Sequence, residues 1–362
     1  MLPALVASRV LWIGVALAAV LVEYANSPLV SGLRATLVSW DAISFLQIAA
    51  HGYPPTLDYR DAFLPGFPLL IRGAAFVVRD DVAAAWLIDL VGEAVGLWFV
   101  YKLVLAERDR GAAAFSVWLV ALLPTAVFFI APFTEAPFMA AAAASLYYGR
   151  QHRFTAAAVA AAAATALRLT GIALLPALLL EELLRHAGSR RRSNAASAAF
   201  SLLIIPLPLV LYCLYMRLRT GDALAMFDAQ GLPSFGHGVA PPWDALVATW
   251  NTMMSAPDAE TRSIFAREVA FGLLGLVACV AMWVSTRVPR SLALYCSVAW
   301  LMTASLTFWR SEPRYFLALF PAVILVADVT RRSRVWRGAL LAASGLLMCA
   351  GVWVFATGHW LG

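Results

Sequence analysis

The sequence predicts an all-α polytopic membrane protein with eleven transmembrane helices. Three observations support this fold class. First, 62% of the 362 residues are hydrophobic and 13% are charged, with a mean hydropathy of +0.79, whereas soluble domains carry about 25% charged residues. Second, the apolar residues form runs of bilayer length, in which helices satisfy their own backbone hydrogen bonds. Third, basic residues cluster in short segments between these runs, as in loops that fix membrane orientation.

Along the chain, each span needs about 20 mostly apolar residues. That length predicts spans at residues 9–25, 82–106, 111–131, 135–150, 154–167, 170–185, 196–217, 266–286, 291–309, 315–330 and 338–357. The first is a retained signal anchor, because it lacks the basic leading region of a cleaved signal peptide. The fifth and sixth are short, either two half-length helices or one bent pair joined at Arg168. All spans belong to a single transmembrane domain, residues 1–362.

The loops indicate the orientation of the chain through the positive-inside rule. With the N-terminus inside, every inside loop is basic, through Arg108, Arg110, Arg150, Arg153, residues 185–192, Arg287, Arg290, Arg331, Arg332, Arg334 and Arg337. Two long loops, residues 26–81 and 218–267, then face outside. Because all the inside loops are short, we expect the chemistry to take place on the outer face.

Composition also limits the partners and the location. The net charge is +6, but no polar domain is present that could hold a basic face for nucleic acid. The four cysteines lie inside apolar runs without a C-x-x-C pair, which argues against disulfides and a metal site. Arginine outnumbers lysine 26 to 1 and alanine is abundant, which suggests a GC-rich bacterial genome. We therefore expect a protein of the bacterial cytoplasmic membrane, with its active site on the extracytoplasmic side.

The first outer loop carries the strongest motif, the segment SWDAISFLQIAAHGY at residues 39–53. Ser39 is a suitable N-cap and Gly52 a suitable helix stop, so we expect an amphipathic juxtamembrane helix that presents Asp41 from its first turn. The segment AFLPGFPLL at residues 62–70 follows. Its two prolines forbid a regular helix across it, so we interpret it as a re-entrant or interfacial element.

Together these segments resemble the signature of the PIG-V family, although Leu64 stands where the family has an aromatic residue. Three further segments resemble family motifs in the family's order, namely residues 124–129 leading to Thr134-Glu135, the R-x-x-G sequence at 168–171, and Pro313-Arg314-Tyr315 with Phe320-Pro321. The family consists of the second mannosyltransferase of GPI-anchor assembly and its bacterial relatives, within the GT-C superfamily of glycosyltransferases.

The resemblance implies an inverting glycosyltransferase that takes its sugar from a polyprenyl-phosphate donor, with mannose the favoured sugar. It implies a lipid-linked or glycolipid acceptor, no nucleotide sugar, and neither a metal ion nor another cofactor. The GPI acceptor does not carry over, because a GC-rich bacterium has no GPI anchor. Transfer of another polyprenyl-phosphate sugar, such as arabinose or glucose, stays open as an alternative.

Residue types in the matching motifs suggest roles. Asp41 is the candidate base for the acceptor hydroxyl, although a carboxylate there could instead complement the helix dipole. Arg168 and Arg314, at predicted outer span ends, are candidates for binding the donor phosphate, with snorkelling or a structural ion pair as alternatives. Further candidates for substrate binding are Trp40, His51, Tyr53 and Glu135. Glu135 could either orient acceptor hydroxyls or pair with an arginine such as Arg168.

Other polar residues favour different interpretations. Asp89 and Glu93 lie inside a predicted span, which suggests either proton-coupled transport or pairing with another span or with Lys102. Asp61 is expected to be solvated. The second outer loop is a candidate acceptor-binding segment through Asp222, Asp228, His237, Trp243, Asp244 and Trp250, of which the two tryptophans are more typical of interface anchors.

Overall fold

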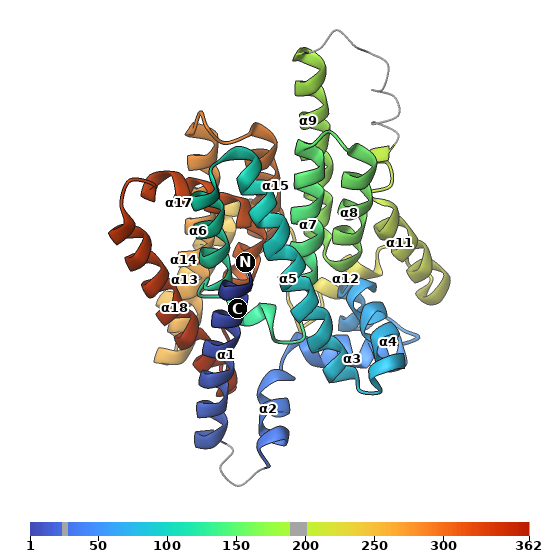
Figure 1. The fold of residues 1–362 in the computed structure, drawn as a ribbon. Coiled ribbons are helices and arrows are strands. Elements are labelled where there is room, and N and C mark those ends of the chain that lie inside the picture. The colour runs from blue at the N-terminus through green and yellow to red at the C-terminus, as the bar shows by residue number, and fades with distance from the viewer. Residues whose placement is uncertain (24–27, 189–200, 362) are drawn as a thin grey trace.

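The computed structural model describes residues 1–23, 28–188 and 201–361, which form helices joined by turns (Figure 1). The α-helices are α1 (Leu2–Glu23), α2 (Leu29–Leu37), α3 (Asp41–His51), α4 (Gly66–Val78), α5 (Asp81–Glu107), α6 (Arg110–Ala121), α7 (Glu135–Arg150), α8 (Phe154–Leu167), α9 (Leu174–Gly188), α11 (Leu207–Thr220), α12 (Ala225–Gln230), α13 (Pro242–Met254), α14 (Ala259–Val284), α15 (Arg290–Ala304), α16 (Glu312–Tyr315), α17 (Val323–Thr330) and α18 (Arg334–Ala356). Short 3₁₀ helices are η1 (Tyr59–Ala62), η2 (Ala126–Phe129), η3 (Leu169–Ala173) and η4 (Phe316–Ala322).

Five helical stretches within the described residues are long and apolar enough to cross a membrane, namely α1, α5, α14, the stretch Glu312–Thr330 and α18. A sixth results if α2 and α3, bent by 97°, are counted as one span. The chain is therefore a multi-pass integral membrane protein. Helices also occupy the other predicted spans, but α6, α7, α8, α9, α11 and α15 have only 12 to 16 residues each. The count of eleven spans stays a prediction. The predicted cluster at 185–192 and the start of the span 196–217 lie partly outside the described residues.

The centre of the bundle is formed by α5, α7 and α8, which run side by side (Figure 1). Alanine faces allow this close packing, because fully buried Ala142 and Ala158 keep the side chains between the helices short. At Gly92 of α5, a Cβ atom would lie 2.7 Å from the backbone nitrogen of Pro137. The two predicted short spans are indeed separate helices, α8 and α9, joined through Arg168 and η3.

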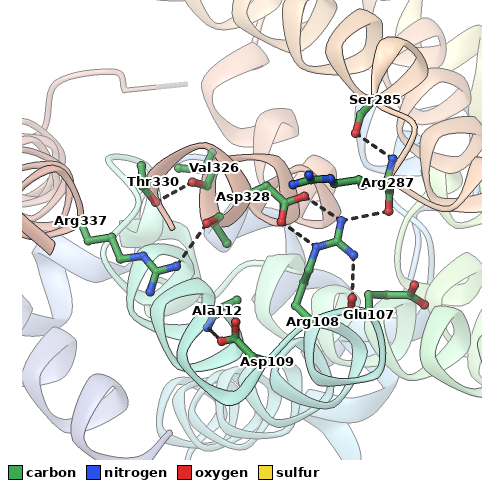
Figure 2. Close-up of polar contacts among 11 residues, drawn as sticks. Glu107, Arg108, Asp109, Ala112, Ser285, Arg287, Val326, Asp328, Thr330 and Arg337 are labelled. Atoms are coloured by element: carbon green, nitrogen blue, oxygen red, sulfur yellow. Dashed lines mark hydrogen bonds and ion pairs between the residues drawn. The ribbon is translucent and has the colours of Figure 1, made fainter. Parts of the chain in front are cut away.

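The loops predicted to lie inside gather at one end of the bundle. Figure 2 shows Arg108, whose Nε and Nη2 donate to the two carboxylate oxygens of Asp328, both at 2.7 Å. Its Nη2 also donates to the carbonyl oxygen of Arg287 at 2.9 Å. Arg150 pairs with Glu107 at 2.8 Å. These ion pairs join loops from four separate parts of the chain. They confirm that these loops lie together, while the side of the membrane stays a prediction.

The first predicted outer loop is more helical than expected. Helix α2 was not predicted, and α3 begins at Asp41 after an N-cap residue Trp40, so the prediction of Ser39 as the cap was wrong by one position. Gly52 ends α3 at a φ of 75°, as predicted. Helix α4 begins inside the proline-rich motif at Gly66. No regular helix runs across the whole segment, as predicted, because residues 63–65 are not helical. Helix α4 can still begin within it, because Pro68 lies in the first turn, where the backbone N–H needs no helical partner.

The start of α4 approaches the end of α8 so closely that a side chain cannot fit between them. A Cβ atom on Gly66 would lie 2.4 Å from the carbonyl oxygen of Ala166. We expect Gly66→Ala to lower the free energy of unfolding by about 1–3 kcal/mol through overpacking. Thermal unfolding in detergent measures this effect. Gly73→Ala is the matched control on the same helix, because nothing lies within 4 Å of its Cβ position. This control should gain about 0.5–1 kcal/mol, and equal melting temperatures for the two variants would contradict the close approach.

Candidate active site

Four charged side chains from distant parts of the chain meet at the end of the bundle opposite to the Arg108 ion pairs. Arg314 Nη1 donates to Asp41 Oδ2 at 2.5 Å, across 273 positions of sequence. Arg314 Nε lies 2.6 Å from Glu135 Oε1. Arg168 Nη1 donates to the same glutamate oxygen and, at 3.0 Å, to Thr134 Oγ1. We call Asp41, Glu135, Arg168 and Arg314 the Asp41 cluster.

Helix starts place the two carboxylates of the Asp41 cluster. Glu135 is the first residue of α7, where the helix dipole favours a negative charge. Asp41 is the first residue of α3 and follows Trp40, whose backbone lies at φ 57° and ψ −125°. A bulky residue rarely adopts a positive φ, and such backbone outliers are concentrated at functional sites. The outlier at Trp40 therefore makes the neighbouring Asp41 a candidate functional residue.

Irregular backbone places the two arginines. Arg168 has extended backbone angles, φ −148° and ψ 141°, between α8 and η3. Helix α8 therefore ends at Arg168, whose side chain binds Glu135. Arg314 belongs to α16, a short helix whose start is held by Glu268 of α14. The Glu268 carboxylate accepts the backbone N–H groups of Ser311 at 3.0 Å and Glu312 at 2.7 Å. Glu268 thereby holds the turn that carries Arg314.

The Asp41 cluster is buried and balanced in charge. Side-chain exposure is 3% for Glu135, 8% for Arg314, 10% for Arg168 and 18% for Asp41. Two guanidinium groups face two carboxylates, which is how buried charges are tolerated. Asp41 is the most exposed member, and its Oδ1 has no hydrogen-bond partner within the described part of the chain. Asp41 is therefore the member of the cluster with a partly exposed oxygen that is free of partners within the described residues.

Aromatic rings form the walls of the Asp41 cluster. The Tyr315 ring lies 5.3 Å from the Arg168 guanidinium carbon and 5.8 Å from that of Arg314. Phe133 lies 5.1 Å from the Arg314 guanidinium carbon. These rings attract the cations and exclude water, and both effects strengthen charge interactions inside the site.

The structure separates the remaining predicted site residues. Trp40 lies beside Asp41 and is 41% exposed. His51 is exposed at the far end of α3, about 15 Å along the helix from Asp41. Tyr53 is buried, and its hydroxyl donates to the carbonyl oxygen of Phe63 at 2.6 Å. The sequence candidates therefore divide into the Asp41 cluster with Trp40 beside it, and His51 and Tyr53 apart from it.

The expectation that Asp61 is solvated was wrong. Its side chain is fully buried in η1, and its Oδ2 accepts the backbone N–H of Asp58 at 3.0 Å. Asp58 caps the same turn by accepting the N–H of Arg60 at 2.9 Å. Burial raises the pKa of the Asp61 carboxyl. Asp61 and Asp58 form a reciprocal capping pair, and their three-residue spacing is the sequence signal that could have revealed it.

The intramembrane carboxylates on α5 are paired in part. Glu93 forms an ion pair with Arg9 of α1, which confirms pairing with another span. Pairing with Lys102 was wrong, because its ammonium lies over the rings of Trp98 and Tyr147, at 5.7 and 5.6 Å. Both Asp89 oxygens are buried without a hydrogen-bond partner in the described residues. A structural ion pair therefore accounts for Glu93, but not for Asp89.

Sequence reasoning did not identify a contribution from the C-terminal segment. The Trp360 ring meets the Trp40 ring edge-on, with centroids 4.9 Å apart. Arg310 lies over Trp360 at 5.4 Å, and Arg267 Nη2 donates to the Trp360 carbonyl oxygen at 2.7 Å. The signal available in the sequence was an aromatic residue just beyond the last predicted span, which ends at the same outer face as Trp40.

The second predicted outer loop lies close to Arg310 and Trp360. The carbonyl oxygen of Ser234, in this loop, lies 3.5 Å from Arg310 Nη1. Burial lowers the pKa of neighbouring His237 to about 4, so this histidine is neutral near pH 7. Trp243 and Trp250 are exposed, as expected for interface anchors. Acceptor binding by this loop stays a prediction.

A groove of about 890 Å³ lies elsewhere, between α8 and the ends of α7 and α9. Tyr148, His152, Arg153 and Arg185 are among the residues that line it, and it contains none of the predicted site residues. Across the described ranges, no three His, Cys, Asp or Glu side chains gather as a metal ion would require.

Comparisons with known proteins bear on the fold and on the sequence resemblance. No family model matches the chain. It is 29% identical, over 234 residues, to GPI alpha-1,6-mannosyltransferase 2 of Cricetulus griseus, which covers 59% of this chain and 45% of that protein. This match is a distant homology to the PIG-V mannosyltransferase and confirms the resemblance of the motifs.

The fold is similar to the crystal structure of the Archaeoglobus fulgidus oligosaccharyltransferase with Zn and sulfate, with a TM-score of 0.51 and 12% identity over 96% of this chain and 53% of that chain. The apo form of that enzyme gives a TM-score of 0.49 and 12% identity over 97% and 55% of the two chains. The chain thus has a GT-C-like all-α fold. It spans about half the length of the proteins that it matches.

Proposed function

We propose that the chain is an inverting GT-C membrane mannosyltransferase. It moves mannose from polyprenyl-phosphate mannose to a lipid-linked or glycolipid acceptor on the extracytoplasmic face of a bacterial cytoplasmic membrane. The proposal includes eleven membrane spans, with residues 26–81 and 218–267 as loops on the outer face. The distant homology to a mannosyltransferase and the GT-C-like fold support the class of reaction. The ion pair between Asp41 and Arg314, with Asp41 Oδ1 left open, is the observation that carries it.

The chemistry requires a base and a fixed geometry. The acceptor hydroxyl oxygen attacks the anomeric carbon from the side opposite to the lipid phosphate, and Asp41 Oδ1 takes the hydroxyl proton. A new carbon–oxygen bond forms to the acceptor while the bond to the phosphate oxygen breaks. The lipid phosphate leaves with that electron pair. Inversion follows, because the new bond forms on the opposite face of the sugar.

Arg314 orients the base. It holds Asp41 Oδ2, so that Oδ1 is the oxygen presented to the substrate. Glu135 balances the charge of Arg314 and Arg168, which lets two arginines stay buried next to each other. Rate then depends on how well this arrangement fixes the carboxylate against the hydroxyl, because orientation supplies a large part of the acceleration in such reactions.

The location of the Asp41 cluster supports a lipid-linked donor. The cluster lies at the end of α7 opposite to the arginine-rich loops, about 22 Å away along the helix. With those loops inside, the cluster faces the extracytoplasmic side, and nucleotide sugars are cytosolic. A sugar carried on a membrane lipid is the donor class available there.

A reconstituted transfer assay tests the proposal. Purified protein in proteoliposomes receives labelled polyprenyl-phosphate mannose, glucose or arabinose, or GDP-mannose, together with a bacterial lipid extract as acceptor. We expect a glycolipid product of inverted anomeric configuration from the polyprenyl-phosphate mannose and no product from GDP-mannose. Absence of transfer from every lipid-phosphate sugar would reject the proposal. Solute uptake that depends on Asp89 would favour a transporter instead.

A further inference from the structure

Both arginines that the sequence suggested as phosphate ligands are already occupied by carboxylates. Arg168 is bound to Glu135, and Arg314 to Asp41 and Glu135. The Asp41 cluster carries no net formal charge, and its arginines are 8% and 10% exposed. A phosphate here would add negative charge beside two carboxylates that already balance the arginines, inside a site almost closed to solvent, which is unfavourable. We therefore expect the cation that binds the donor phosphate to lie outside the Asp41 cluster.

Arg310 has the free donors that such a site needs. A guanidinium carries five N–H donors. In the described residues, Arg310 forms no ion pair, and its hydrogen bonding is limited to the long 3.5 Å contact with Ser234. Arg267, which also reaches Trp360, is different, because its donors bind the Trp360 carbonyl oxygen and, at 3.3 Å, the Ser263 hydroxyl.

Arg310 is held on a fixed aromatic platform. Its guanidinium carbon lies 5.4 Å from the centre of the Trp360 ring. Trp360 is fixed by Arg267 at its backbone and by the edge-on contact with Trp40. Trp40 directly precedes Asp41 in the chain, so two indole rings connect Arg310 to the candidate base. The half-buried position of Arg310 reduces its competition with bulk water.

We propose that Arg310, seated on Trp360, binds the phosphate group of the lipid-linked sugar donor. This inference rests on the proposed function and names the donor-binding residue of the same site. In an inverting displacement, the attacking hydroxyl and the leaving phosphate lie on opposite sides of the anomeric carbon. The base and the phosphate-binding cation must therefore be separated by the sugar ring. Contacts through the Trp40 and Trp360 rings connect Asp41 to Arg310, and these partly exposed indoles offer apolar contact to a sugar between the two side chains.

Direct binding of the lipid phosphate tests the inference without relying on catalysis. Polyprenyl phosphate is titrated onto purified full-length protein in nanodiscs, and affinity is measured for the wild type, Arg310→Gln and Arg310→Lys. We expect a loss of about tenfold to a hundredfold in Arg310→Gln, as for removal of a charge-assisted phosphate contact. Arg310→Lys should lose less affinity, because lysine keeps the positive charge but cannot form bidentate hydrogen bonds to the phosphate. Wild-type affinity in Arg310→Gln would overturn the inference.

The matched control is Arg262→Gln. Arg262 is an exposed arginine in the first turns of α14, and its side chain forms no ion pair or hydrogen bond within the described residues. It should bind polyprenyl phosphate as the wild type does. A loss equal to that of Arg310→Gln would show a general charge effect and contradict a specific site. Inorganic phosphate that competes at the same concentration as polyprenyl phosphate would contradict a site for a lipid donor.

Kinetics separates this inference from the proposed function. In the transfer assay, Arg310→Gln should raise KM for the donor about tenfold or more while kcat changes less. An active wild type with an unchanged donor KM in Arg310→Gln would overturn the role of Arg310 and leave the transferase intact. An inactive wild type that still binds polyprenyl phosphate through Arg310 would reject the transferase and leave the phosphate site.

Discussion

Asp41→Asn is expected to reduce the rate of sugar transfer by about 10²- to 10⁴-fold, the range that general base catalysis supplies. The amide is nearly the same size as the carboxylate, and its oxygen can still accept the hydrogen bond from Arg314. It cannot take the proton of the acceptor hydroxyl. The loss should therefore appear in kcat, measured at saturating donor in the reconstituted assay, while donor affinity stays close to that of the wild type.

Two control variants accompany Asp41→Asn. Asp41→Glu keeps the charge but shifts the carboxylate by one methylene, so it should retain a small measurable rate. Asp81→Asn removes a carboxylate from the first turn of α5, which has no side-chain contact in the described residues, and should keep the wild-type rate. Normal turnover in Asp41→Asn, with thermal stability unchanged, would contradict the assignment of Asp41 as the base.

Glu135→Ala is expected to lower the free energy of unfolding by about 3–5 kcal/mol, because it breaks a buried ion pair by removing one partner. Glu135 is almost fully buried, and a single one of its oxygens pairs with both Arg168 and Arg314. Without it, two positive charges stay buried beside each other with only Asp41 to balance them. Chemical or thermal unfolding in detergent measures this loss.

Glu260→Ala is the matched control for Glu135→Ala. Glu260 pairs with His359 in an exposed contact at 2.6 Å, so its removal should cost about 1 kcal/mol or less. The double variant Glu135→Ala with Arg168→Ala should recover part of the loss, since one of the unpaired charges is removed with its partner. Equal stability of Glu135→Ala and Glu260→Ala would contradict the account of the Asp41 cluster as a buried charge network.

The helical architecture was largely visible in the sequence, because apolar run length and charge placement follow directly from the bilayer. The run at 82–106 matches α5 to within one residue at each end, and the run at 338–357 lies within α18 apart from its last residue, although α18 begins four residues earlier. The prediction that the two short spans, as half-length helices or a bent pair, join at Arg168 was confirmed in the place of the junction, since α8 ends there and η3 begins.

The details of the first outer loop were harder to predict. The two prolines predicted no regular helix across residues 62–70, yet α4 begins within this segment at Gly66, where only a residue without a side chain fits against Ala166. Asp61 read as a solvated loop residue, yet the packing of Tyr212 against η1 buries it. Such outcomes depend on which segment lies on top of the loop, and local sequence does not carry that information.

Sequence motifs located the Asp41 cluster but not its pairing. Asp41, Glu135, Arg168 and Arg314 each stood in a motif, and the structure brings them into one network. That pairing supports the alternative of structural ion pairs for the two arginines, while phosphate binding by them stays a prediction. Nothing in the sequence indicated Arg310, because its relevance comes from its contact with Trp360, which follows the last helix, α18.

The role of Asp41 as the base can be observed in a cryo-EM structure with a non-hydrolysable polyprenyl-phosphonate mannose and an acceptor lipid. We expect the acceptor hydroxyl within about 3.2 Å of Asp41 Oδ1, with Arg314 still on Oδ2 and the sugar between Asp41 and the phosphonate. A sugar bound at the arginine-rich end of the bundle, or an Asp41 carboxylate that contacts Arg314 and no part of either substrate, would contradict this role.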